Sequence, residues 1–202
     1  LSYFVGNISP SSIIGKFYGI DIRNIGSGNA GATNALRTMG KKAGLITLIL
    51  DILKGFIMPL ITFLFIGLPG YYFAGFFVVI GHMWPVVFKF KGGKGVATAV
   101  GTLFFINPLV GFIGLIIVLV FTLITKIVSF AVLLACIIII PLSFFIAKND
   151  FPYIFLIVVL IIIKHSGNIN RLFNGTENKI SLGTPKKDKE AYLRARESAK
   201  KN

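Results

Sequence analysis

Residues 127–147 read IVSFAVLLACIIIIPLSFFIA, a run that carries no charged side chain. A helix needs about 20 consecutive apolar residues to cross the hydrocarbon core of a bilayer. Because the run reaches that length, we predict a transmembrane helix over it. The run indicates an integral membrane protein, since soluble domains seldom contain an uninterrupted apolar run of this size.

The composition of the whole chain agrees with a membrane protein. The chain has 202 residues, 55% of them hydrophobic, and its mean hydropathy is +0.84. Soluble domains are about 45–50% apolar even when glycine is counted. The single cysteine, Cys136, lies within the apolar run, where we expect it to pack or to contact lipid. The sequence therefore predicts an all-α, polytopic integral membrane protein.

Seven apolar segments predict seven transmembrane helices. Two of them, residues 96–106 and 151–163, are short, so five crossings is the alternative if these two do not span. The seven segments are residues 1–20, 44–68, 71–90, 96–106, 109–125, 127–147 and 151–163.

The loop charges orient these segments. With seven crossings, nearly every loop cation falls on one side, and the opposite side has only Lys148, which Asp150 offsets. The positive-inside rule makes the basic side cytoplasmic, which puts the amino terminus outside and the carboxyl terminus in the cytoplasm. We expect one domain over residues 1–202, with residues 185–202 as a basic cytoplasmic tail. The net charge of +14 is explained by topology and lipid headgroups, so no nucleic-acid partner is predicted.

The first polar island, GSGNAGATNALR at residues 26–37, begins with the G-x-G-x-x-G spacing of dinucleotide-binding proteins. That fingerprint requires a buried strand before it, whereas a polar, charged stretch precedes it here. Backbone N–H groups at the start of a helix still favour an anion, and residues three and four apart share a helix face. We therefore predict a phosphate or carboxylate site, the alternative being an interfacial helix that faces headgroups. Its candidate residues are Ser27, Asn29, Thr33, Asn34 and Arg37.

The second polar island, residues 81–98, reads GHMWPVVFKFKGGKGVAT. It is no nucleotide P-loop, because Gly95 stands where Ser or Thr should follow the lysine. A glycine loop with one lysine, leading into a helix, can still hold a phosphate through its N–H groups. The candidates are Gly92, Gly93, Lys94, Gly95 and His82, the last being a site residue or a buried structural histidine.

The third polar island, KHSGNINRLFNGTENKI, covers residues 164–180. His165, Asn168 and Arg171 recur every three residues, so a helix would align them. Within the second apolar segment, Asp51 and Lys54 are three apart, and we predict an ion pair there, with contact between Lys54 and a ligand as a further option. The two histidines and scattered acids give no metal-ligand spacing, so we predict neither a metal site nor a cofactor.

Together the three islands resemble the bacterial acyl-phosphate:glycerol-3-phosphate acyltransferase family. The resemblance rests on GSGNAGATNALRTMGKKAG, GHMWPVVFKFKGGKGVAT and KHSGNINRLFNGTE, in that order, with DILKG after the first. Ala30 departs from the pattern, because the family usually has proline there. The resemblance implies seven helices in the bacterial cytoplasmic (inner) membrane, with the active site on the cytoplasmic side.

The resemblance also implies the substrates and their ligands. An acyl phosphate would donate its fatty acyl group to glycerol 3-phosphate, giving lysophosphatidic acid and inorganic phosphate. Membrane lipid is an expected partner, and the enzyme that makes the acyl phosphate is a candidate one. By motif position, the family's substrate-binding and catalytic residues correspond to Ser27, Arg37, Lys94, His165 and Asn168, and Gly92–Gly95 would hold the donor phosphate. The hydroxyl proton would go to His165 or to a substrate phosphate oxygen.

A transporter or channel for a phosphorylated metabolite is the rival function. Carriers use anion sites near broken helices, but their charged groups line a path across the membrane. Here the charged groups concentrate at one face, and only Asp51, Lys54 and His82 lie within apolar segments. A non-catalytic membrane scaffold would leave the three polar islands without a purpose.

Overall fold

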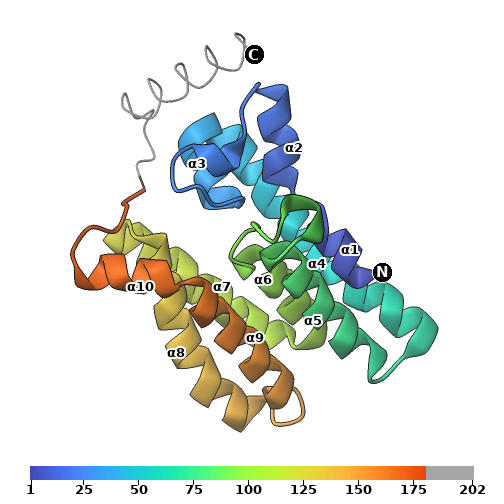
Figure 1. Cartoon of the computed structure of the whole chain (residues 1–202). Helices are drawn as coiled ribbons and strands as arrows, with labels where there is room; N and C mark the ends of the chain where they lie inside the picture. The colour runs from blue at the N-terminus through green and yellow to red at the C-terminus, as the bar shows by residue number, and fades with distance from the viewer. Residues whose placement is uncertain (181–202) are drawn as a thin grey trace.

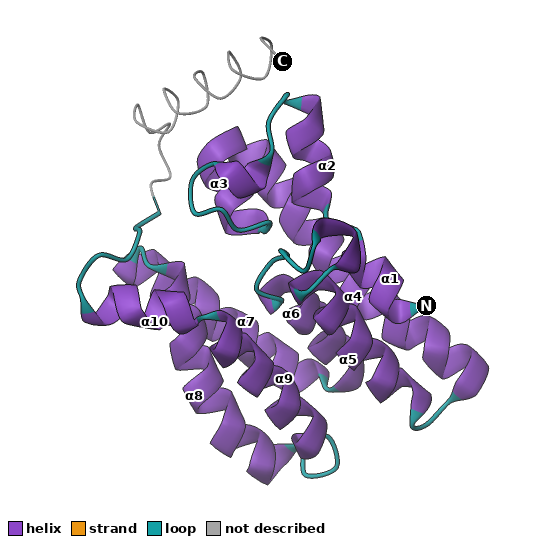
Figure 2. Cartoon of the chain, viewed as in Figure 1, coloured by secondary structure: helices purple, strands orange, loops and turns teal. Residues whose placement is uncertain are grey.

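The computed structural model describes residues 1–180, which form α-helices and two 3-10 turns and contain no strand (Figures 1 and 2). The predicted all-α class is thereby confirmed for this range, while the predicted tail, residues 185–202, lies outside it. The elements are α1 (Ser2–Asn7), α2 (Pro10–Phe17), η1 (Ile22–Asn24), α3 (Ala32–Met39), α4 (Lys41–Ile66), α5 (Gly70–Met83), η2 (Val86–Phe88), α6 (Val96–Ile106), α7 (Pro108–Thr125), α8 (Val128–Ile146), α9 (Phe151–Lys164) and α10 (Ser166–Phe173).

Four helical stretches between residues 1 and 180 are long and apolar enough to cross a bilayer. They are α4, α5 with its continuation to Phe88, α7 and α8. A fifth is added if α9 and α10, which meet at an angle of 58°, are counted as one broken span. The shorter α6 follows the predicted segment 96–106, and the first predicted segment is divided into α1 and α2.

The helices approach one another closely through glycines. A Cβ atom on Gly55 of α4 would lie 2.0 Å from the carbonyl oxygen of Thr98 in α6. A Cβ on Gly101 of α6 would lie equally close, 2.0 Å, to the carbonyl oxygen of Ile52 in α4. Helices in lipid associate through such close packing of small residues, because no hydrophobic effect drives them together. The contact fixes the amino-terminal end of α6 against α4.

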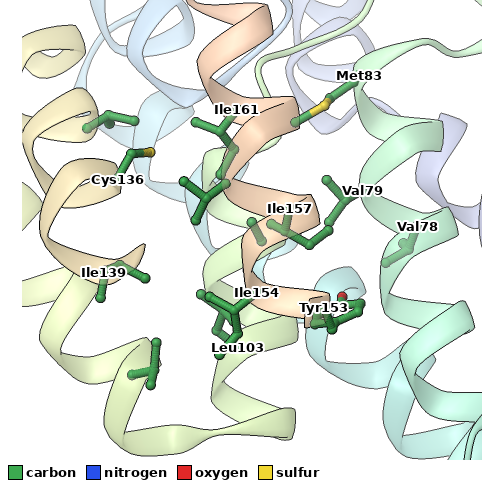
Figure 3. Close-up of a cluster of buried hydrophobic side chains, with 14 of the residues drawn as sticks. Val78, Val79, Met83, Leu103, Cys136, Ile139, Tyr153, Ile154, Ile157 and Ile161 are labelled. Carbon is green, nitrogen blue, oxygen red and sulfur yellow. The ribbon is translucent and has the colours of Figure 1, made fainter. Parts of the chain in front are cut away.

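The main hydrophobic core lies along α9, between α5, α6 and α8 (Figure 3). Ile154 and Ile157 of α9 are almost fully buried in it. Cys136 of α8 is also buried in this core, so packing, rather than lipid contact, is its role. The core therefore holds α9 rigidly, and Figure 1 shows α10 turning away at the end of that helix. The residues at and after this turn form one part of the candidate site.

Candidate active site

The glycine loop, residues 92–95, lies within the second polar island and leads into α6. The N–H of Gly93 donates a hydrogen bond to the carbonyl oxygen of His82, 3.0 Å away, which ties the loop to the end of α5. Gly95 adopts a left-handed conformation (φ 80°) immediately before α6, a conformation that glycine adopts without strain. The side chain of Lys94 leaves this loop and donates a hydrogen bond to Oδ1 of Asn168 in α10. The second and third islands thus meet in space.

A polar chain continues from Asn168. Its Nδ2 donates to Oε1 of Glu177 at 2.8 Å, and Nε of Arg171 donates to Oε2 of the same carboxylate at 2.9 Å. The Glu177 side chain is only 8% exposed. Because the Nδ2 of Asn168 is bound to Glu177, the amide is held with its oxygen toward Lys94. Arg171 shares the helix face predicted for Asn168, whereas no periodicity pointed to Glu177, which lies beyond α10.

His165 lies at the bend between α9 and α10 and is 2% exposed. Its Nδ1 is 2.8 Å from the carbonyl oxygen of Ile161, one turn earlier. A carbonyl oxygen can only accept, so Nδ1 carries the hydrogen of this bond. In the neutral imidazole, Nε2 is then the nitrogen that remains able to accept a proton.

The first island reaches the same region. Nε of Arg23, just before the island, donates to the carbonyl oxygen of Lys91 at 3.1 Å and so joins this part of the chain to the second island. Arg37 of α3 and Arg171 both lower the pKa of Lys94 through their positive charge. Arg37 therefore lies within electrostatic range of Lys94, and Arg23 joins the chain before the first island to the second island.

Burial is the largest influence on Lys94 and lowers the pKa of its ammonium to about 8. The negative charge of Glu177 acts in the opposite direction and raises this pKa, and the two arginines then lower it again. An anion beside Lys94 would relieve the repulsion between these cations. The electrostatics therefore favour a negatively charged ligand.

Asn34 is placed differently from the other predicted residues of the first island. It is 1% exposed, its Oδ1 accepts from the backbone N–H of Ser27 at 2.9 Å, and its Nδ2 donates to the carbonyl oxygens of Ile22 and Ile25. Its amide therefore holds the loop around Ser27. By contrast, Ser27 itself is exposed, and Asn29, Thr33 and Arg37 are half-buried.

His82 contacts a different set of side chains from Lys94 and Asn168. It is buried in the last turn of α5, with Nδ1 2.9 Å from Nζ of Lys54 and 3.2 Å from Oδ1 of Asp51. Asp51 and Lys54 form the predicted ion pair, at 2.7 Å, which is confirmed. In residues 1–180, no three His, Cys, Asp or Glu side chains gather into a group that could hold a metal ion.

The sequence of this chain is similar to those of known acyltransferases. A family model described as "Glycerol-3-phosphate acyltransferase" matches residues 1–175. A relative of that name from Finegoldia magna is 47% identical over 183 residues, which cover 88% of this chain and 92% of the relative. Another from Aquifex aeolicus is 43% identical over 183 residues, covering 88% of this chain and 95% of its own length.

Two solved structures share the fold. Both are crystal structures of PlsY (YgiH), an integral membrane glycerol 3-phosphate acyltransferase. The glycerol 3-phosphate form superposes with a TM-score of 0.83 at 42% identity and covers 89% of this chain and 92% of that one. The lysophosphatidic acid form gives a TM-score of 0.81 at 40% identity, covering 90% and 92%. The chain therefore belongs to the glycerol-3-phosphate acyltransferase family of integral membrane enzymes.

Proposed function

We propose that the protein transfers a fatty acyl group from an acyl phosphate to the primary hydroxyl of glycerol 3-phosphate. The products are lysophosphatidic acid and inorganic phosphate, the first step of bacterial phospholipid synthesis. The observation that carries this proposal is the hydrogen bond from Lys94 to Asn168, two residues of distant segments, with the positive charge of Arg37 acting on Lys94, in a chain of this family. Both substrates bear phosphate, and a cluster of cations with polar neighbours suits two phosphorylated molecules.

The acceptor phosphate is held by Arg37, Lys94 and Ser27. The side chain of Arg37 has no hydrogen bond or ion pair with another residue in 1–180, so its guanidinium is available to a ligand. His165 and Asn168 complete the pocket around the glycerol, and Asn29 and Thr33 of the first island supply further polar contacts. Asn34 keeps the role that its contacts suggest, holding the loop around Ser27 in place.

The donor phosphate is held by the backbone N–H groups of the glycine loop, residues 92–95, other than that of Gly93, which donates to the carbonyl oxygen of His82. Loops of this kind bind anions through converging amides without a metal ion. The acyl chain extends from this loop toward the surrounding lipid. A phosphate bound there sits beside Lys94, whose charge also stabilises the phosphate that leaves.

The reaction is an acyl transfer in one displacement at the carbonyl carbon. The primary hydroxyl oxygen of glycerol 3-phosphate forms the new ester bond, and the bond between the carbonyl carbon and the phosphate oxygen breaks. Phosphate leaves with the electron pair, and the hydroxyl proton passes to Nε2 of His165 or to a substrate phosphate oxygen. The hydrogen bond from His165 Nδ1 to Ile161 supports the first route. Positioning and charge stabilisation supply most of the rate.

Replacement of the histidine separates the two proton routes. We expect His165→Gln to lower kcat at least about 100-fold if the imidazole accepts the proton, a typical contribution of a general base. Near-normal turnover in this variant would eliminate the histidine route and leave the substrate phosphate as the acceptor. Single-turnover measurement of ester formation is the direct readout.

The same proposal includes the membrane arrangement. One domain over residues 1–202 crosses the bacterial inner membrane seven times, with the amino terminus outside and the carboxyl terminus in the cytoplasm. The loop cations support this orientation, because those of the three islands then share the cytoplasmic side with the water-soluble acceptor. Delivery of the acyl phosphate makes the enzyme that produces it a candidate partner.

A reaction with defined substrates tests the proposed function. Protein purified in detergent is incubated with synthetic acyl phosphate and glycerol 3-phosphate, and both phosphate release and lysophosphatidic acid are measured. We expect both products in equal amounts, and none when acyl-CoA replaces the acyl phosphate. Product formation from acyl-CoA alone would overturn the donor assignment. Uptake of glycerol 3-phosphate into proteoliposomes without ester formation would favour a transporter.

A further inference from the structure

Three ionisable side chains outside the proposed substrate pocket form a compact buried cluster. The cluster consists of Asp51 and Lys54 of α4 and His82 of α5, which are 1%, 8% and 6% exposed. Nζ of Lys54 also donates to the carbonyl oxygens of Ile8 at 2.8 Å and Gly6 at 3.3 Å, at the end of α1. The cluster therefore ties three helices together at one point.

The imidazole of His82 connects this cluster to the glycine loop. On one side of the ring, Nδ1 contacts Asp51 and Lys54. On the other side, a Cβ atom added to Gly93 would lie 2.0 Å from Nε2, 2.8 Å from Cε1 and 2.9 Å from Cδ2. The ring is thus a spacer of fixed thickness between the ion pair and the residue immediately before Lys94.

A need for stability alone does not explain such a cluster. Burying charges removes them from water at a cost of several kcal/mol per ion, and well-packed apolar residues of similar volume are often as stable or more so. An ion pair that also engages backbone carbonyls can, however, hold a ring in one orientation. The benefit is then positional, and a misplacement of about 1 Å in an active site can cost about 100-fold in rate.

We propose that Asp51, Lys54 and His82 are positioning residues that set the location of the glycine loop and hence of Lys94. They act without touching either substrate. The inference rests on the proposed function of the loop, because it assigns these residues a role in placing the amides that bind the donor phosphate. It predicts that Gly93 must be glycine because of the His82 ring, to which the three atoms nearest to an added Cβ all belong.

The test is a compensating pair of substitutions. Gly93→Ala should lower kcat/KM for the acyl phosphate at least about 100-fold, because the new methyl group displaces the loop from the ring. His82→Asn keeps a polar group near Asp51 and Lys54 but lacks Nε2 and Cε1 of the ring. The double variant His82→Asn/Gly93→Ala should recover at least about tenfold of the activity lost in Gly93→Ala. Two neighbouring groups that act on each other are expected to show such non-additivity.

Gly92 provides a matched control in the same loop. A Cβ on Gly92 would lie 2.1 Å from the carbonyl oxygen of His82 and 2.8 Å from that of Met83, which are backbone atoms that no side-chain substitution removes. Gly92→Ala should therefore lose activity to a similar extent and should gain nothing from His82→Asn. Recovery of both glycine variants would overturn the proposal, because it would show a general loosening of the loop.

The remaining outcomes are also decisive. The thermal unfolding midpoint is measured for every variant. If His82→Asn and His82→Asn/Gly93→Ala do not fold, His82→Ala and His82→Ala/Gly93→Ala are made in their place. No recovery in a folded double variant contradicts the proposal. If neither His82 variant folds while Gly93→Ala does, the cluster is a stability element and the proposal fails. Wild-type turnover of acyl phosphate is assayed alongside, so that failure of the proposed function is seen separately from failure of this inference.

Discussion

The two ends of α9 carry polar residues of opposite character. At its start, Oδ1 of Asp150 accepts from the hydroxyl of Tyr72, and Oδ2 accepts from Nδ2 of Asn107 at 2.8 Å. At its other end, about 21 Å away at 1.5 Å per residue, His165 is buried at the bend into α10, and Asn168 accepts a hydrogen bond from Lys94 of the glycine loop. We call the first end closed, because each carboxylate oxygen has a partner in the protein, and the second end open, because we propose that a substrate anion binds there.

The difference separates structural from functional polarity in a membrane protein. The Asp150 carboxylate joins α5, the turn before α7 and the start of α9, and each of its oxygens has a partner within the protein. Around Lys94, by contrast, the charges that act on the ammonium are those of two arginines and the single carboxylate of Glu177, which leaves these four side chains with a net positive charge. Because net positive charge is costly where it is buried, we infer that a substrate anion completes the second set.

The largest expected effect is a loss of activity at the open end. Lys94→Met should lower kcat/KM for the reaction by about 1000-fold, the magnitude seen when one preorganised charge or donor is removed from an active site. The unfolding midpoint should change by only a few degrees. Lys91→Met, a substitution of an exposed lysine in the same island, is the matched control and should stay within about threefold of wild type. Equal losses in the two variants would show that the effect is not specific to Lys94, and the proposed anion site would lose its support.

A loss of stability is expected at the closed end. Asp150→Ala leaves the Tyr72 hydroxyl and the Asn107 amide without an acceptor, so we expect the free energy of unfolding to fall by about 2–3 kcal/mol. The folded fraction should keep kcat/KM within about threefold of wild type. Thermal unfolding in detergent and steady-state kinetics measure the two quantities. A large loss of activity with unchanged stability would show that Asp150 belongs to the reaction.

The pH dependence of activity gives a smaller and graded effect. The pKa of Lys94 is lowered to about 8, so the ammonium is charged below this pH and neutral above it. Binding of phosphate should weaken as pH rises through about 8, and kcat/KM should fall about tenfold per pH unit. Lys94→Arg should abolish this decline, because the guanidinium stays charged. This holds whatever the absolute activity of the variant. A decline that persists in Lys94→Arg would have to come from another group.

The same group affects stability with the opposite sign. Because its folded pKa is lower than the unfolded value near 10.5, the folded state binds fewer protons between pH 8 and 10.5. The contribution of Lys94 to stability should therefore rise with pH across this window while activity falls. An unfolding midpoint that decreases more steeply in wild type than in Lys94→Met over this range would contradict the assignment.

Much of the fold and site could be predicted from the sequence for definite physical reasons. Apolar runs long enough to cross the hydrocarbon core of a bilayer predict helices. The three polar islands were recognisable because polar residues are costly in the membrane-spanning parts of such a chain. The Asp51–Lys54 pair followed from a spacing of three on one helix. These features depend on neighbouring residues, so they can be read locally.

Features that depend on distant residues were not predictable in this way. Glu177 accepts from Asn168 nine residues earlier, and its role follows only from the path of the chain beyond α10. The first apolar segment, predicted as one helix, is divided into α1 and α2, and the contact of Lys54 with the end of α1 depends on that division. The place of His82 beneath Gly93 required the fold of the whole α5–α6 connection.

The central claim is that three separated segments form one anion site at the end of α9. Titration calorimetry of glycerol 3-phosphate with wild type, Arg37→Met, Lys94→Met and Asp150→Ala tests it most directly. We predict that each of the two cation variants binds at least about tenfold more weakly, while Asp150→Ala binds as wild type does. Wild-type affinity in either Arg37→Met or Lys94→Met would contradict the claim, because the first and second islands would then not share the site.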